Sequence, residues 1–283
     1  MKLVTSKATV HGAISIVNAI STGKGSALGV SLKTIAEISL LKGEGKIIYN
    51  NHNTELFDYL IKKILPKKML ATHNICLSIY SEIPIGFGLK SSSAVSSAVS
   101  LACYGLLDRT DDLTILNTAV RASRKAKITV TGAYDDSAAC YFGGFVVTDN
   151  YSNTLIRRDK APNNIYAIIL LPRNSRRKDI LKLKLLPKLF NKAIEFAEKS
   201  DYWQAMNLNG LLVSSLMSYD YTPVLSSIEQ GALSASISGN GPSVAVVSKE
   251  KNVQDILSVL KKYGKTLVCK INNNKASVDN IVG

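Results

Sequence analysis

The chain has 283 residues, of which 46% are hydrophobic and 20% are charged, a composition that is typical of a globular protein and excludes a disordered one. Its length suffices for two domains of roughly 100–200 residues each. The 35 Lys and Arg residues outnumber the 21 Asp and Glu residues, and the net charge of +14 indicates either an anionic partner, such as a phosphate compound or a nucleic acid, or a solvated basic surface.

Cysteine and histidine usage argues against a structural metal site and against disulfides. The four cysteines are far apart and form no CxxC pair, and the three histidines do not cluster with them. We therefore expect buried thiols in a reducing compartment. No uncharged stretch is apolar enough for a membrane helix, and His11 and Asn18 interrupt the N-terminal stretch that comes nearest to a signal peptide. These features predict a cytoplasmic protein without membrane contact.

Hydrophobic periodicity predicts strands and helices in the first half of the chain. Apolar residues at i, i+3, i+4 and i+7 indicate helices, and alternation of apolar and polar residues indicates half-buried strands. The predicted elements are, in chain order, a strand over 34–41, a helix over 54–65, a strand over 74–83, helices over 95–106 and 113–126, and a turn that leads into a strand over 143–149.

The second half begins after a polar, Pro-containing segment over 151–164. Such segments commonly separate domains, so we divide the chain into domains of residues 1–155 and 156–283. The predicted elements of this half are a strand over 163–172, helices over 187–199 and 202–217, a strand, glycine turn and strand over 234–248, a helix over 251–262 and a closing strand over 265–271.

A loop rich in glycine and serine, PIGFGLKSSSA at residues 84–94, lies between a predicted strand and the helix over 95–106. This arrangement directs several backbone N–H groups and the positive end of a helix dipole at one point, which favours an anion. Gly86 and Gly88 permit unusual backbone angles, the serines add hydroxyl donors, and Lys90 adds positive charge. A plain turn with a serine N-cap would account for one serine but not for three.

Two familiar nucleotide motifs do not fit the sequence. The Walker pattern requires a glycine five residues before its Gly-Lys-Thr, and Val259 stands there before Gly264. The dinucleotide fingerprint requires a third glycine where Ser91 stands. The loop therefore predicts a phosphate site of another kind.

Three motifs resemble those of the GHMP kinases, the superfamily of galactokinase, homoserine kinase and mevalonate kinase. Residues 84–94 resemble its phosphate-binding motif, Pro-x-x-x-Gly-Leu-x-Ser-Ser-x-Ala. GAYDDSAACYFGG at 132–144 is similar to the segment with the catalytic aspartate, and SGNGPS at 238–243 is similar to the C-terminal glycine motif. The three motifs occur in the superfamily's order and together span the chain.

The resemblance implies an α+β fold with two domains, an N-terminal one with a left-handed βαβ unit and a C-terminal ferredoxin-like one. ATP and the substrate would lie in the cleft between them. The motif implies that ATP is bound by Pro84, Ile85, Gly86, Phe87, Gly88, Leu89, Lys90, Ser91, Ser92, Ser93 and Ala94.

Two adjacent aspartates are candidates for the catalytic base. A kinase that acts on an alcohol needs a carboxylate to orient the hydroxyl and accept its proton. In mevalonate kinases six residues separate the active aspartate from a Gly-Gly pair, and six separate Asp136 from Gly143. The resemblance therefore implies Asp136 as the base. We expect Asp135 to be an N-cap or first-turn acid of the helix that follows.

The N-terminal segment SIVNAISTGKGSALGVSL at 15–32, combined with TGAYDDS and EIPIGFGLKSSSA, is similar to the archaeal type of shikimate kinase, a GHMP family. The segment lacks the Gly-Glu-His of the sugar and mevalonate branches and the Leu-Gly-Pro-Gly-Phe-Asp of homoserine kinases. The resemblance implies conversion of ATP and shikimate to ADP and 3-phosphoshikimate on the pathway to aromatic amino acids. Alternatives are a homoserine or mevalonate-type kinase and, from another class, a basic nucleic-acid-binding protein; we expect small-molecule partners and no nucleic acid.

Shikimate carries one carboxylate and three hydroxyls, so its pocket needs a cation and short polar side chains. The substrate residues that the resemblance suggests are Asn18, Thr22, Lys24, Ser26, Gly239 and Gly241. Lys24 could equally be an exposed loop lysine, and Arg158 or the basic run over 173–188 could bind the carboxylate instead. The Mg²⁺ that accompanies ATP is expected at Ser92 and Glu82, although Glu82 could equally be an acid at a strand edge.

Overall fold

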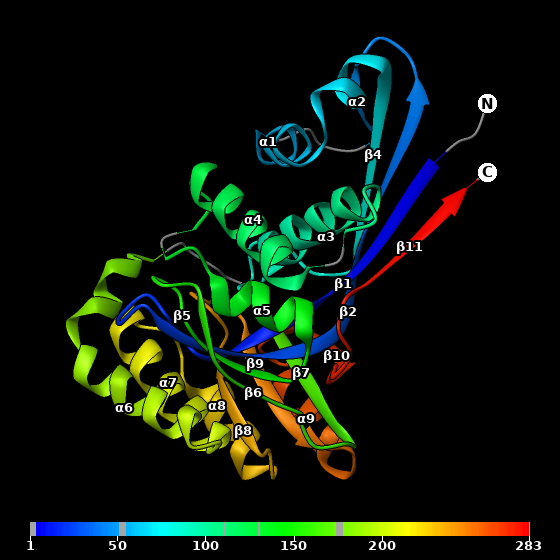
Figure 1. The fold of residues 1–283 in the computed structure, drawn as a ribbon. Coiled ribbons are helices and arrows are strands. Elements are labelled where there is room, and N and C mark those ends of the chain that lie inside the picture. Colours follow the sequence, from blue (N-terminus) through cyan, green and yellow to red (C-terminus); the bar gives the residue numbers. More distant parts are fainter. Residues whose placement is uncertain (1–3, 51–54, 110, 130, 174–177, 283) are drawn as a thin grey trace.

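The computed structural model describes residues 4–50, 55–109, 111–129, 131–173 and 178–282 (Figure 1). Within these ranges no helix combines the length and the apolar character needed to cross a membrane. The two ends of the described chain lie side by side at one end of the molecule, where the first and last strands pair (Figure 1).

The first half of the described chain contributes six of the seven strands of one sheet, and β11 near the C-terminal end supplies the seventh. The strand order is β11-β1-β2-β4-β3, and β5 and β6 extend the sheet from the other end of β2. β2 is long enough to pair with β5 through residues 24–28 and with β4 through residues 34–42. The strands are β1 (Val4–Val17), β2 (Lys24–Lys42), β3 (Ile47–Tyr49), β4 (His73–Ser81), β5 (Phe145–Asp149), β6 (Thr154–Asp159) and β11 (Ser277–Val282).

Helices cover one face of this sheet, and α3 and α5 pack directly on β1 and β2 (Figure 1). β3 and β4 pair in parallel and are joined by α1 and α2, which makes a βαβ unit. The helices of this half are α1 (Glu55–Ile64), α2 (Lys67–Thr72), α3 (Ser91–Gly105), α4 (Asp112–Lys125) and α5 (Tyr134–Phe142).

The second half contains an antiparallel sheet with the strand order β10-β7-β9-β8. The chain order of strands and helices is that of a ferredoxin-like βαββαβ unit. The elements are β7 (Ile165–Pro172), η1 (Ile180–Leu185), α6 (Pro187–Glu198), α7 (Tyr202–Met217), α8 (Thr222–Glu229), β8 (Ser234–Ile237), β9 (Val244–Lys249), η2 (Glu250–Asn252), α9 (Val253–Leu260) and β10 (Gly264–Lys270). The predicted α+β fold is confirmed.

Two strands of the first sheet contain residues from beyond the predicted domain division. β6, over 154–159, spans the boundary between residues 155 and 156 and pairs with β5 of the first sheet. β6 is an edge strand whose residues are mostly exposed, so it has the polar composition that resembled a linker. β11, over 277–282, returns to pair with β1. The two-domain division itself stays a prediction.

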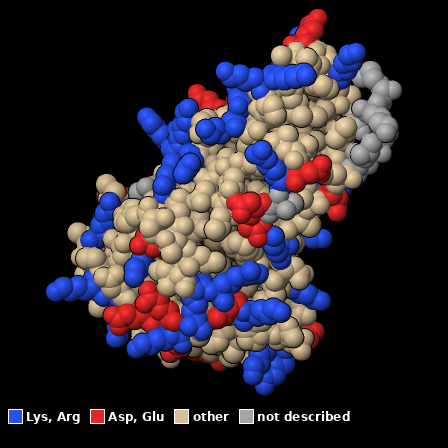
Figure 2. Space-filling view, viewed as in Figure 1, with Lys and Arg blue, Asp and Glu red and all other residues tan. Residues whose placement is uncertain are grey.

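Charged residues are distributed widely over the face shown in Figure 2. On the face shown in Figure 2, Lys and Arg side chains occur on both halves of the molecule, with Asp and Glu side chains among them. Of the basic run over 173–188, residues 174–177 lie outside the described residues. The excess positive charge is therefore not concentrated in one patch on this face.

The two halves meet through aromatic packing between β5 and α7. The rings of Phe145 and Tyr202 stack with centroids 3.8 Å apart and planes 1° apart, and Trp203 meets Phe145 edge-on at 5.4 Å. The Tyr202 hydroxyl donates to Asp159 Oδ2 at 2.6 Å. Phe145 thus fixes the second half against the first sheet.

Replacing Phe145 tests this contact. Phe145→Ala removes a buried ring from the junction and should lower the free energy of unfolding by about 3–5 kcal/mol in chemical denaturation. Leu225→Ala, at a position that is 53% exposed, is the control and should change it by less than about 0.5 kcal/mol. Equal effects of the two substitutions would contradict the structural role of the stack.

Candidate active site

A cleft of about 830 Å³ lies between the two halves of the chain. Its walls come from the end of β1, the loop before α3, the start of α5 and the loop between β8 and β9. The lining residues used below are Ser15, Asn18, Ala19, Gly86, Gly88, Lys90, Ser92, Asp135, Asp136, Lys178, Tyr219, Gly239 and Asn240.

The loop over 84–90 leads into α3 through left-handed backbone conformations. Gly86, Gly88 and Lys90 have φ angles of +86°, +74° and +66°. Leu89 between them is buried in the core and anchors the loop. The first N–H groups of a helix have no partner within the helix, so the start of α3 presents free donors to the cleft.

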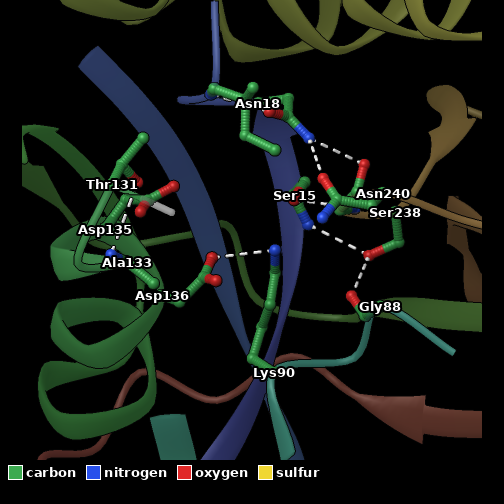
Figure 3. A network of polar contacts seen from close by, with 12 residues as sticks. Ser15, Asn18, Gly88, Lys90, Thr131, Ala133, Asp135, Asp136, Ser238 and Asn240 are labelled. Carbon is green, nitrogen blue, oxygen red and sulfur yellow. Dashed lines mark hydrogen bonds and ion pairs between the residues drawn. The ribbon is translucent and has the colours of Figure 1, made fainter. Parts of the chain in front are cut away.

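The loop over 238–243, which connects β8 to β9, is hydrogen-bonded to the loop over 84–90 (Figure 3). The Ser238 hydroxyl donates to the Gly88 carbonyl at 3.0 Å, and the Ser243 hydroxyl donates to the Phe87 carbonyl. A Cβ at Gly88 would lie only 2.2 Å from the Ser238 carbonyl oxygen. The two loops therefore hold each other in place.

The end of β1 joins the same network. Ser15 donates its backbone N–H to Ser238 Oγ at 3.3 Å, and its own hydroxyl accepts from the Gly239 N–H at 2.9 Å. The Asn18 amide donates to the Gly239 carbonyl at 2.9 Å and to Asn240 Oδ1 at 3.0 Å. Three segments that are far apart in sequence thus form one wall (Figure 3).

An ion pair joins the loop to α5. Lys90 Nζ lies 2.8 Å from Asp136 Oδ1, and these side chains are only 7% and 15% exposed. Burial lowers the pKa of Lys90, but the charges of Asp136 and Asp135 outweigh that effect and leave the pKa raised. Lys90 therefore stays protonated and contacts Asp136 directly at the wall of the cleft (Figure 3).

Asp135 is 4% exposed and has different partners. Its Oδ1 accepts a hydrogen bond from Asn150 Nδ2 at 2.7 Å. Burial and, after it, the negative charge of Asp136 raise the pKa of Asp135 to about 7, against the opposing effect of Lys90. Around neutral pH the Asp135 carboxyl group is therefore partly protonated.

Most of the predicted site residues lie together. Of the predicted ATP, substrate and catalytic residues, those that line the cleft are Asn18, Pro84, Ile85, Gly86, Gly88, Leu89, Lys90, Ser91, Ser92, Ser93, Asp136, Gly239 and Gly241. Phe87 and Ala94 support the loop from outside the cleft, because Phe87 offers its carbonyl to Ser243 and Ala94 is buried in the core.

In the segment around Lys24, the side chains that were predicted to bind substrate do not line the cleft, and a neighbouring glycine lies against it instead. Lys24 pairs with Glu198 at 3.3 Å outside the cleft, and the Thr22 hydroxyl bonds to the Lys24 backbone. Ser26 is buried and donates to the Val146 carbonyl in the sheet. Gly25 instead faces the site, because a Cβ there would lie 2.3 Å from Asp135 Oδ2. Alternation along β2 places Lys24 and Gly25 on opposite sides.

Two other predicted residues also lie away from the cleft. Glu82 is exposed and accepts the Lys33 backbone N–H at 2.8 Å, as an acid at a strand edge would. Arg158 donates to the Phe142 carbonyl and covers the Phe142 ring. The basic run reaches the cleft through Lys178, whose Nζ lies 5.7 Å from the centre of the Tyr219 ring.

Sequence reasoning did not single out Asn150, Thr131, Tyr219 or Asn240. Asn240 lies inside the SGNGPS motif and could have been found there, because the motif as a whole pointed to the site. Asn150 and Tyr219 carry no local signal, since their roles arise from contacts with distant segments.

The loop contact can be tested with a matched pair of glycines. Both Gly86→Ala and Gly88→Ala force a side chain into positive φ, which costs roughly 1–2 kcal/mol. A Cβ at Gly86 meets nothing within 4 Å, whereas a Cβ at Gly88 collides with backbone. We expect Gly88→Ala to lower the free energy of unfolding by about 1–3 kcal/mol more than Gly86→Ala in chemical denaturation. Equal losses would show that Ser238 does not brace the loop.

The chain is similar to several known proteins. The family model for the GHMP kinases N terminal domain matches residues 54–144. The chain is 35% identical over 281 residues to a shikimate kinase of Methanosarcina acetivorans, covering 95% of each chain. It is 34% identical over 265 residues to a shikimate kinase of Pyrococcus furiosus, covering 90% of this chain and 95% of that one.

Solved structures show the same fold at lower identity. The homoserine kinase of Cytophaga hutchinsonii superposes with a TM-score of 0.73 at 20% identity, covering 97% of both chains. The mevalonate kinase of Methanococcus jannaschii superposes with a TM-score of 0.74 at 18% identity, covering 94% of this chain and 98% of that one. The full-length similarity to the two shikimate kinases is the more specific finding, and by it the chain belongs to the archaeal shikimate kinase family of the GHMP kinases.

Proposed function

We propose that the protein transfers the γ-phosphoryl group of ATP to the 3-hydroxyl of shikimate and releases ADP and 3-phosphoshikimate. One observation carries the proposal: the loop at the start of α3 and the carboxylate of Asp136 line the same cleft and are joined by Lys90 at 2.8 Å. A phosphate site and a candidate base must be adjacent for phosphoryl transfer to an alcohol. The relatives named shikimate kinase support the choice of acceptor.

The phosphates of ATP would bind at the start of α3. The first backbone N–H groups of α3 have no partner among the described residues, and the helix dipole favours negative charge. The space beside Gly86 is open, since a Cβ there would meet no atom within 4 Å. The serine hydroxyls of the first turn, of which Ser92 is exposed, add further donors.

Asp136 would orient the acceptor hydroxyl and take its proton. As the hydroxyl oxygen forms its bond to the γ-phosphorus, the bond from that phosphorus to the β,γ-bridging oxygen breaks and ADP leaves with the electron pair. The proton moves to an oxygen of Asp136. Lys90 holds this carboxylate in one position and balances its charge, because the two groups form a nearly buried ion pair.

The residues present also fit a magnesium ion at one point. Mg²⁺ in kinases usually binds one or two protein oxygens and otherwise phosphates and water. Ser92 lines the cleft at the start of α3, and we propose it as a ligand, whereas the Glu82 carboxylate is engaged by Lys33 away from the cleft. When bound, the ion neutralises negative charge on the β- and γ-phosphates.

The acceptor's carboxylate needs a cation. Among the three candidates from the sequence, Lys24 and Arg158 lie outside the cleft, and the basic run contributes Lys178 to its rim. Lys178 stands over Tyr219, whose hydroxyl donates to the Asn240 carbonyl at 2.8 Å. We therefore place the shikimate carboxylate near Lys178.

A coupled assay of ADP release tests the proposed reaction. Shikimate should stimulate ADP release, and homoserine and mevalonate, the acceptors of the alternative kinase activities, should not. If shikimate gives no stimulation, the proposal fails. RNA binding that persists at roughly 200 mM salt would instead support the nucleic-acid-binding alternative.

Asp136→Asn tests the assignment of the base. The amide has nearly the shape of the carboxylate but cannot accept the proton, so kcat should fall by about 10²–10⁴-fold while ATP affinity changes little. Asp255→Asn, an exposed aspartate on α9, is the matched control and should keep wild-type kcat. Unchanged turnover in Asp136→Asn would move the base to another residue.

A further inference from the structure

Asp135 places a second carboxyl group in the cleft beside Asp136. Both residues belong to the first turn of α5 and line the cleft. Asp136 is paired with Lys90, whereas Asp135 takes part in no ion pair among the described residues. The proposed phosphoryl transfer assigns a role to Asp136 and none to Asp135, although burying a carboxyl group costs free energy.

Asn150 fixes the orientation of Asp135. It donates to Asp135 Oδ1 at 2.7 Å, and its own Oδ1 accepts the Asp135 backbone N–H at 3.0 Å. Asn150 is fully buried and is held by the Thr148 hydroxyl, which donates to it at 2.7 Å, and by Thr131, to which it donates at 3.2 Å. The carboxyl group is therefore preorganised by a buried polar network.

Among the described residues, no side chain donates a hydrogen bond to the second oxygen of Asp135, whereas Oδ1 accepts one from Asn150. Oδ2 lies against Gly25, where a Cβ would approach it to 2.3 Å and would approach Ala19 Cβ to 2.9 Å. Ala19 itself lines the cleft. A fixed and largely desolvated oxygen of this kind favours a donor supplied by a ligand.

We propose that Asp135 binds the hydroxyl next to the one that is phosphorylated, and so makes the site selective for an acceptor with two neighbouring hydroxyl groups. The inference rests on the proposed function, because it takes the reacting hydroxyl to lie at Asp136. Both carboxyl groups line the cleft from the first turn of α5, so an acceptor held at Asp136 would present its neighbouring hydroxyl to Asp135. In shikimate the neighbouring group is the 4-hydroxyl.

The protonation of Asp135 is compatible with this role. Its pKa of about 7 results from burial first and then from the charge of Asp136, with Lys90 and Asn150 opposing the rise. An ionised carboxylate accepts a hydrogen bond from a hydroxyl, and a protonated one can also donate to it. The contact therefore persists on both sides of neutral pH.

The test compares kcat/KM for shikimate with that for 4-deoxyshikimate. Wild-type enzyme should prefer shikimate by roughly 10–100-fold, as expected for one hydrogen bond to a charged group. Asp135→Ala should reduce the preference to within about threefold of unity, and Asp135→Asn should retain part of it because an amide still bonds a hydroxyl. Asp255→Ala is the matched control and should keep the wild-type preference.

The ratio is independent of how much enzyme is folded, since both rates scale with the active fraction. If Asp135→Ala turns over neither compound, their dissociation constants measured by calorimetry supply the same comparison. The inference is overturned if the preference is equal in wild type and Asp135→Ala, or if the wild type has none. Failure of the wild type to phosphorylate shikimate at all overturns the proposed function, and the inference with it, and is a separate result.

Discussion

Lys90 and Asp136 carry opposite charges in a place that is almost closed to water, and their ion pair constrains the site around it. A buried charge without a partner costs several kcal/mol, so the two side chains must be held where Nζ and Oδ1 meet at 2.8 Å. For Lys90 this requires a left-handed backbone at the start of α3. For Asp136 it requires the first turn of α5, where the helix dipole also favours a carboxylate. The loop and the candidate base cannot separate without leaving both charges unpaired.

The ferredoxin-like half completes this arrangement. Ser238 reaches the Gly88 carbonyl from 150 positions away in the sequence, and Ser15 of β1 bonds to Ser238 and Gly239. Because Gly88 has no room for a side chain at this contact, the loop is shaped by the second half of the chain as much as by its own glycines. The cleft therefore exists only when both halves are folded and packed, which is consistent with the stacked rings of Phe145 and Tyr202 at their junction.

The sequence permits prediction of those parts of the site that depend on local backbone requirements. The loop at 84–94 was identified because a tight turn at a helix start needs glycines and serines in a fixed order, and the structure places most of it in the cleft. The approach of Gly25 to Asp135 was not predictable, because it depends on how far β2 extends and on which of its faces meets α5. Lys24, which the sequence suggests because of its charge, lies on the opposite face of the same strand from Gly25 and pairs with Glu198. An edge strand such as β6 resembles a linker in its sequence, because its residues are mostly exposed and therefore mostly polar.

Asp135 and Asp136 show that the position of a residue in the sequence does not by itself determine the chemical role of its side chain. Asp135 and Asp136 are neighbours in the sequence, so spacing rules treat them almost alike, and their partners distinguish them. Lys90 balances the charge of Asp136, while burial and the proximity of Asp136 raise the pKa of Asp135 to about 7. Both effects lower the negative charge of the cleft at neutral pH. A site that receives a polyphosphate benefits from this, because two free carboxylates beside it would repel the incoming charge. The cleft can thus contain two carboxyl groups for binding an alcohol and remain favourable for an anion.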